Sequence, residues 1–151
     1  MDDLPPSFFR RQDETADEHF YRQPRFVTHL DNAAIGAVTA LYREDFAPGA
    51  WVLDLMSSWI SHLPPEVSYG EVVGLGLNRE ELAANPRLTR FVVHNLNTRP
   101  ALPFADGSFD AAGLAVSIDY LTHPVTVLRD LRPDAVHGLA MTFTPSRRSA
   151  A

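Results

Sequence analysis

Short apolar segments alternate along this chain with segments of helical periodicity, and that alternation constrains the fold more than any other feature. Residues 51–55 form an apolar run with one acid, Asp54, which is typical of a strand buried in a parallel sheet. Similar strand-like runs follow at 71–75, 90–94, 109–116 and 136–143. Strands that alternate with helices need right-handed crossovers. The pattern therefore predicts an α/β fold, a three-layer sandwich with a mostly parallel sheet between helices.

Helices are expected before and between these strands. A 3.6-residue spacing of apolar residues predicts a helix over 30–42, carried by Leu30, Ala34, Val38 and Leu41. Residues that commonly begin helices precede three further segments: Ser57 or Ser58 (a helix to about Leu63), Asn78, and Thr122 followed by Pro124. Pro64-Pro65, Pro86 and a turn at 132–134 would end these three helices.

The 151 residues suit a single domain with its own core, and no internal repeat is visible. Residues 1–24 are expected to form a polar arm, with charged groups interleaved with aromatic rings. Within and just after the arm, Phe20, Tyr21 and Arg25 are candidates for a lid over a binding site, or for simple packing on the body.

Composition excludes several classes of function. The chain has no cysteine, which rules out disulfides, thiolate metal sites and cysteine nucleophiles. A net charge of −6 argues against a nucleic-acid partner, which calls for a clustered basic surface. No apolar run approaches the roughly 20 residues of a membrane span, and Met1 to Leu4 do not begin a signal peptide. A cytoplasmic location and no membrane partner are expected.

The carboxyl ends of the predicted strands are the expected place for a ligand, because parallel α/β sheets bind ligands there. Four successive strand ends carry small or polar residues: Met56 to Ser58, Gly74 to Asn78, His94 to Asn97, and Ser117 to Tyr120. Asp54 is the most informative residue, since burying its carboxylate without a partner would be costly. A ligand ammonium, a turn N–H or the cap of a following helix would each satisfy it.

Three stretches resemble class I S-adenosylmethionine-dependent methyltransferases, in particular the small-molecule type 11 branch. They are 52–55 (VLDL), 72–76 (VVGLG) and 102–110 (LPFADGSFD), of which the last is the most specific. The run 128–133 (LRDLRP) also resembles the helix and turn before the fifth strand of that family. The resemblance spans about residues 20–148 and makes 25–151 the expected methyltransferase-like domain.

The resemblance implies S-adenosylmethionine as cofactor and a small-molecule methyl acceptor. The cofactor-binding residues that it implies are Asp54, Ser57, Gly74, Gly76, Asn78, Asn95 and Leu96. Asp54 would anchor the methionyl end, Asn78 the ribose, and Asn95 with Leu96 the adenine. Acceptor-side groups follow the fourth strand in such proteins, where this chain has Asp119, Tyr120 and His123 as candidates for orientation or proton removal.

The chain also departs from the family's pattern. Met56, Ser58 and Ile60 stand where the first motif usually has glycines that admit the cofactor. Gly76 occupies the position of the ribose-binding acid, so Glu80 is a second candidate beside Asn78. Asn95 stands where the family often has an acid near the adenine amino group. The amide oxygen of an asparagine can still accept a hydrogen bond from that amino group.

The family usually continues past the fifth strand into a helix and an antiparallel strand pair, whereas here only a few residues follow Phe143. The chain is expected to lack that pair. The exposed sheet edge would be covered by another chain, for example in a homodimer, or the sequence is a shortened product.

Other readings are weaker. The third glycine of a dinucleotide fingerprint beginning at Gly74 would fall on Arg79, and the motif follows the wrong strand for a dehydrogenase. The histidines show no metal-ligand spacing, so no metal site is expected. No serine lies in a G-x-S-x-G turn, which leaves serine hydrolase chemistry without support. The remaining alternative to a methyltransferase is a degenerate, non-catalytic domain that acts as a binding or interaction module.

Overall fold

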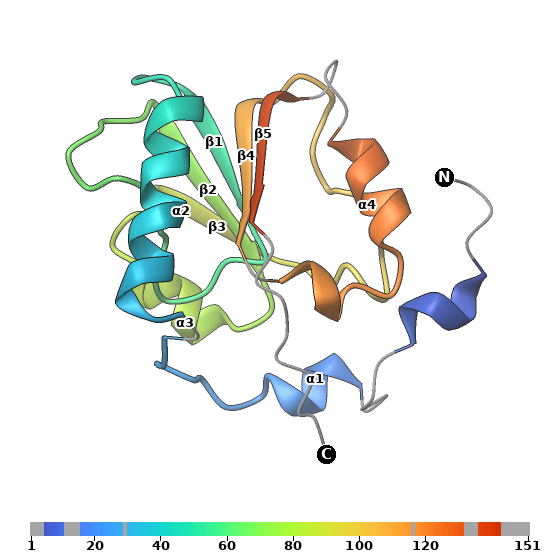
Figure 1. Ribbon diagram of the computed structural model, residues 1–151. Coiled ribbons are helices and arrows are strands. Elements are labelled where there is room, and N and C mark those ends of the chain that lie inside the picture. The colour runs from blue at the N-terminus through green and yellow to red at the C-terminus, as the bar shows by residue number, and fades with distance from the viewer. Residues whose placement is uncertain (1–4, 11–15, 29, 116, 132–135, 143–151) are drawn as a thin grey trace.

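A computed structural model describes residues 5–10, 16–28, 30–115, 117–131 and 136–142 of the chain. Its centre is a five-stranded sheet in the order β3-β2-β1-β4-β5 (Figure 1). The strands are β1 (Trp51–Leu55), β2 (Glu71–Gly76), β3 (Arg90–Val93), β4 (Phe109–Ala115) and β5 (Val136–Thr142). Every neighbouring pair is parallel. The predicted α/β fold and its parallel sheet are confirmed, with strand bounds within one residue of the expected ones.

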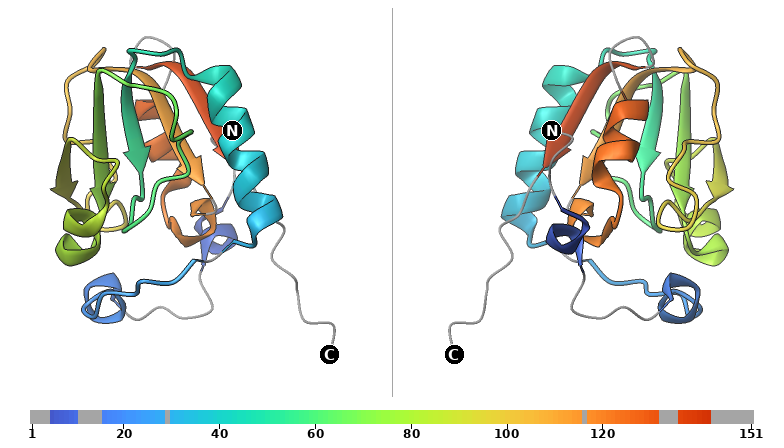
Figure 2. Two further views of the ribbon diagram at one scale, coloured as in Figure 1. Left: turned by 90° about the vertical axis from the view of Figure 1, so that its left-hand side faces the viewer. Right: turned by 90° about the vertical axis from the view of Figure 1, so that its right-hand side faces the viewer.

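Helices cover both faces of the sheet, as Figures 1 and 2 show. α2 (Asn32–Asp45) lies on one face and α4 (Pro124–Asp130) on the other. Because side chains alternate along a strand, Val52 packs with Tyr42 of α2 and with Phe46, which directly follows that helix. Leu53 and Leu55 pack on the α4 side. The two apolar cores give the predicted three-layer arrangement.

The smaller elements lie near the carboxyl ends of the strands. They are α1 (Asp17–Phe20), α3 (Arg79–Ala84) and the 3₁₀ turns η1 (Pro6–Phe9) and η2 (Ile118–Tyr120). Figure 2 shows α1 beyond the arrowheads of the strands, so part of the N-terminal segment lies at the edge where a ligand would bind. None of the helices in the described part of the chain could span a lipid bilayer.

The prediction of a helix after β1 is wrong. Residues 56–70 are all described and form a loop with turns but no helix. Ser57 and Ser58 were expected to begin this helix, but their side chains make other hydrogen bonds. The Ser57 hydroxyl donates to Asp54 and the Ser58 hydroxyl to Glu81. Ser57 thus bonds back to the acid at the end of β1 and Ser58 to a residue of α3, and neither hydroxyl caps a local helix.

The other helices form close to their expected positions. Asp31 caps α2 by accepting from the Ala34 N–H at 2.8 Å, and Asn78 caps α3 as predicted. The N-cap of α4 is His123 and not Thr122, whose hydroxyl donates instead to Asn97. The expected turn at 132–134 and the sequence after Thr142 lie outside the described residues.

Candidate functional site

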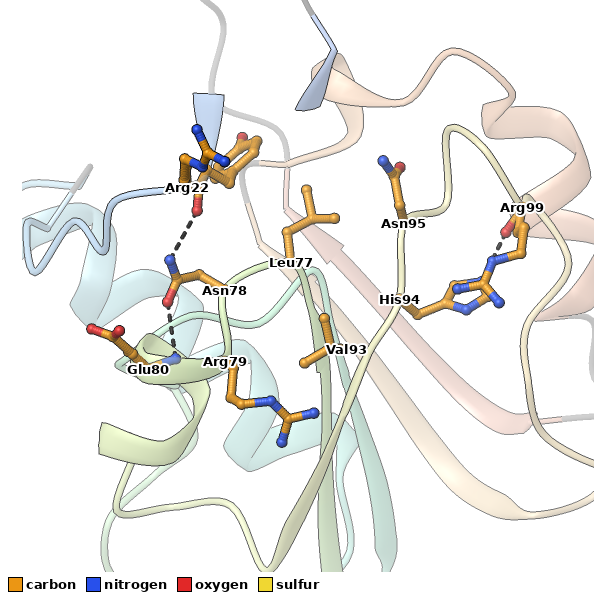
Figure 3. A pocket seen from close by; sticks show the side chains of 10 residues that line it. Arg22, Leu77, Asn78, Arg79, Glu80, Val93, His94, Asn95 and Arg99 are labelled. Carbon is orange, nitrogen blue, oxygen red and sulfur yellow. Dashed lines mark hydrogen bonds between the residues drawn. The ribbon is translucent and has the colours of Figure 1, made fainter. Parts of the chain in front are cut away.

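A cavity of about 400 Å³ opens at the carboxyl ends of β2 and β3 (Figure 3). Open parallel sheets place their ligands at this edge. The cavity combines apolar side chains with amides and charged groups, and it is lined by Tyr21, Arg22, Leu77, Asn78, Arg79, Glu80, Val93, His94, Asn95 and Arg99. It is therefore suited to a small ligand with both apolar and polar parts.

Gly76 ends β2 directly before Leu77 and Asn78, which line the cavity. A Cβ atom at this position would collide with the carbonyl oxygen of Ser57, so only glycine lets the loop after β1 cross the end of β2. The Ser57 N–H also donates to the carbonyl oxygen of Leu75 at 2.8 Å. The end of β2 thus has no room for the carboxylate that a larger residue would bring there.

Asn78 joins one wall of the cavity to the N-terminal segment. Its Oδ1 accepts from the N–H groups of Glu80 and Glu81, both at 3.0 Å, and its Nδ2 donates to the carbonyl oxygen of Tyr21 at 2.9 Å. A second link runs from the Arg25 N–H to Glu81 Oε1 at 2.6 Å. These bonds hold Tyr21 and Arg22 in the lining of the cavity, where Figure 3 shows Arg22 beside Asn78.

The opposite wall is the loop after β3, which His94 holds in shape. The imidazole is buried, and its Nε2 lies 2.8 Å from the carbonyl oxygen of Arg99 and 3.1 Å from that of Ala101. Since both partners are acceptors, Nε2 is the nitrogen that carries the proton. Asn95 is buried beside it, and its Oδ1 accepts from the Asn97 N–H at 2.9 Å.

His94 therefore donates a hydrogen bond that holds the loop after β3 in shape. Across the described ranges, no three His, Asp or Glu side chains are grouped so that they could hold a metal ion.

Asp54 lies under the loop after β1 and not in the lining of the cavity. Its Oδ2 accepts from the hydroxyls of Ser57 at 2.6 Å and Ser61 at 2.5 Å. Burial raises the pKa of this carboxyl, and the two hydroxyl bonds oppose the rise. Asn85 completes the network by donating to Ser61 Oγ and to the carbonyl oxygen of Ser58. The chain's own hydroxyls, and not a turn N–H or a helix cap, satisfy the acid.

The structure brings only some of the candidate residues together. Asn78 and Asn95 line the cavity. Gly74 lies inside β2, where a Cβ atom would collide with Leu88, and Leu96 is buried in the core beneath the β3 loop. Asp54 and Ser57 belong to the separate network above.

The acceptor-side candidates are exposed beside the β3 loop. Asp119 and Tyr120 lie in η2 and His123 at the start of α4. Asn97 links this region to the cavity wall: its Nδ2 donates to the carbonyl oxygen of Tyr120 at 2.9 Å, and its Oδ1 accepts from the Thr122 N–H at 2.8 Å.

Sequence reasoning missed most of the charged lining. Arg79 and Arg99 follow β2 and β3 by a few residues, so their short distance from the predicted strand ends could have identified them as candidates. No sequence pattern could have identified Arg22. Its segment lies at the cavity because of a hydrogen bond between Asn78 and Tyr21, which are 57 positions apart.

No protein-family model matches the chain, and no curated protein matches it either. Solved structures do match. The PH0226 protein of Pyrococcus horikoshii OT3 aligns with a TM-score of 0.61 at 18% identity, covering 83% of this chain and 66% of that one. A SAM-dependent methyltransferase from Aquifex aeolicus aligns with a TM-score of 0.55 at 15% identity over 98% of this chain and 77% of that one.

The [4+2]-cyclase SpnF aligns with a TM-score of 0.51 at 19% identity over 63% of this chain. The chain spans only 39% of the length of SpnF and less than half of several other proteins that it matches. At sequence identities this low, structural similarity establishes the fold and does not establish the reaction. The chain has the fold of class I S-adenosylmethionine-dependent methyltransferases.

Proposed function

We propose that this chain binds S-adenosylmethionine with the adenosyl half in the cavity at the ends of β2 and β3, and that it supports methyl transfer to a small-molecule acceptor. The observation that carries the proposal is the position of that cavity in a sheet of this fold. The cofactor would supply a methyl group on a sulfonium, and the protein would contribute alignment and exclusion of water.

The residues of the cavity fit an adenosyl group in part. Tyr21, Leu77 and Val93 offer apolar contact for a base, and Asn95 an amide close to it. Asn78 is a weaker partner for the ribose, because its Oδ1 already accepts two N–H groups and one Nδ2 hydrogen is used. Glu80 supplies the one carboxylate among the lining residues and is the better candidate for the ribose hydroxyls.

The loop after β1 is the candidate place for the methionyl half. Met56 has a positive φ of 54°, which turns the chain sharply at the end of β1. In this proposal Asp54 acts indirectly, by fixing Ser57 and Ser61 and with them the path of the loop. Asp119, Tyr120 and His123 remain the candidates for the acceptor side.

Calorimetric titration with S-adenosylhomocysteine tests the proposal. We expect saturable binding that Val93→Trp weakens, because Val93 is exposed in the cavity wall and a larger ring would fill the space. Thr126→Trp is the matched control, since Thr126 is exposed on α4 and does not line the cavity. No heat and no thermal shift at millimolar ligand would contradict the proposal, as would equal binding by Val93→Trp.

A second candidate function is a non-catalytic binding module. It is favoured by two features: the carboxylate of Asp54 is already bonded to the hydroxyls of Ser57 and Ser61, and the last residue of β2 is Gly76 and not an acid. SpnF, described as a [4+2]-cyclase, shares the fold, which therefore does not by itself fix the reaction. Absence of S-adenosylhomocysteine binding in a folded chain would favour this candidate.

We also propose that a second copy of the chain covers the outer edge of β5. Within the described residues β5 pairs with β4 on one side only, and an open strand edge favours pairing with another chain. Sedimentation equilibrium should then give the mass of a dimer, whereas a monomer across the whole concentration range would contradict it.

A further inference from the structure

The cavity at the ends of β2 and β3 carries positive charge that an adenosyl group does not call for. Three of its lining residues, Arg22, Arg79 and Arg99, are arginines, against a single carboxylate on Glu80. The chain as a whole has a net charge of −6. Positive charge is therefore concentrated at this site against the general balance of the molecule.

The three arginines reach the cavity from three separate segments. Arg22 follows α1, Arg79 begins α3, and Arg99 lies in the loop after β3. Figure 3 shows them on different sides of the cavity. Because all three residues line the same cavity, a charged group bound there would have arginines on more than one side.

The backbone beside each of these side chains is held. The carbonyl oxygen of Tyr21, next to Arg22, accepts from Asn78, and the Arg99 N–H donates to the carbonyl oxygen of Asn95 at 2.9 Å. Arg79 begins a capped helix, and its guanidinium lies 5.7 Å from the centre of the Phe91 ring. None of the three guanidinium groups is ion-paired with a residue of the described part of the chain. Their charges are therefore available to a ligand.

The end of β2 points to the same kind of ligand. In nucleotide-binding α/β folds an acid after the second strand binds the ribose hydroxyls, while an arginine nearby accommodates a phosphate on the ribose. Here Gly76 excludes a carboxylate at the strand end by its contact with Ser57, and Arg79 follows three residues later. A carboxylate would repel a phosphate, whereas a guanidinium binds it with two hydrogen bonds.

We propose that this cavity binds a nucleotide with a phosphate on its ribose, held by Arg79 together with Arg22 and Arg99, more tightly than the unphosphorylated nucleoside. The inference rests on the proposed nucleoside site and goes beyond its proposed cofactor, with which such a nucleotide would compete.

The test is calorimetric titration of the chain with adenosine, adenosine 2′-monophosphate, adenosine 5′-monophosphate and inorganic phosphate. We expect one of the two nucleotides to bind at least about tenfold more tightly than adenosine, as a charged hydrogen-bonded pair allows. Added salt should weaken nucleotide binding and leave adenosine binding nearly unchanged. Equal affinity for adenosine and both nucleotides, or an affinity for inorganic phosphate equal to that for the nucleotides, would overturn the proposal.

Charge-removing variants locate the effect. Arg79→Gln and Arg99→Gln should each reduce nucleotide binding toward the affinity for adenosine. Arg90→Gln is the matched control, because Arg90 is exposed on β3, bonds to Glu71 at 2.7 Å and does not line the cavity. An equal loss in Arg90→Gln would show a general charge effect and overturn the proposal. The three substituted residues, Arg79, Arg99 and Arg90, are all exposed, so we expect thermal unfolding to show that each variant folds.

S-adenosylhomocysteine in the same series separates the two proposals. If it binds while the nucleotides bind no better than adenosine, the phosphate site is wrong and the proposed cofactor stands. If a nucleotide binds tightly and S-adenosylhomocysteine does not, the phosphate site stands and the proposed cofactor is wrong.

Discussion

At the scale of single residues, Gly76 shows how closely the loop after β1 lies on β2. A Cβ atom there would meet a backbone carbonyl oxygen, which cannot move aside as the end of a flexible side chain can. We predict that Gly76→Ala lowers the free energy of unfolding by about 1–3 kcal/mol, the usual cost of overpacking. Urea denaturation measures the change.

Gly36→Ala is the control for this substitution. Gly36 lies in the exposed part of α2, and a Cβ atom added there would meet nothing within 4 Å. Alanine should raise the free energy of unfolding there by about 0.5–1 kcal/mol, because it favours the helix. If both variants changed stability in the same direction, the close contact at Gly76 would be refuted.

Asp54 gives a prediction about pH. Burial raises the pKa of its carboxyl above the ordinary value of 3.8, despite the hydroxyl bonds from Ser57 and Ser61. The folded state thus binds this proton more tightly than the unfolded state, and Asp54 costs stability as the pH rises from 3.8 through the folded pKa. Asp54→Asn should therefore be more stable relative to wild type at neutral pH than in acid. A difference between the two free energies of unfolding that does not change with pH would contradict this.

At the scale of elements, Asn78 makes two separate connections: its Oδ1 caps α3 by accepting from two N–H groups, and its Nδ2 donates to the carbonyl oxygen of Tyr21. Asn78→Ala removes both the cap and the donor to Tyr21, and we expect the free energy of unfolding to fall by about 1 kcal/mol or more. Asn78→Asp keeps the capping oxygen, places a negative charge at the start of the helix and removes only the donor.

The aspartate variant should therefore retain most of the stability while trypsin cleaves after Arg22 faster than in wild type. Denaturation and limited proteolysis of the two variants measure the cap and the link to Tyr21 separately. An aspartate variant as unstable as the alanine variant would show that the cap contributes little.

The strands were predictable from sequence because local information determines them. The runs at 51–55 and 71–75 are apolar on both faces and bounded by turn residues, and the structure places β1 and β2 there. The helix expected from Ser57 failed for the opposite reason. Its serines bond to Asp54 and Glu81. Ser58 and Glu81 are 23 positions apart in the sequence, and no local pattern shows that folding brings them together.

At the scale of the whole molecule, the cavity joins parts that sequence reasoning treated separately. The strand ends were expected to lie side by side, and Asn78 and Asn95 do line one cavity. The contribution of Tyr21 and Arg22 depends on tertiary contacts, as does the burial of Leu96 in the core. The positions of parallel strand ends follow from topology, whereas the segments that cover them follow from packing.

The central claim is that this cavity receives the adenosyl half of S-adenosylmethionine. Backbone amide chemical shifts of the ¹⁵N-labelled chain, followed during titration with S-adenosylhomocysteine, test it most directly. We predict saturable shifts concentrated at Leu77, Asn95 and Arg99, with the amides of α4 nearly unchanged. Saturable shifts confined to other parts of the molecule, or no shifts at millimolar ligand, would contradict the account.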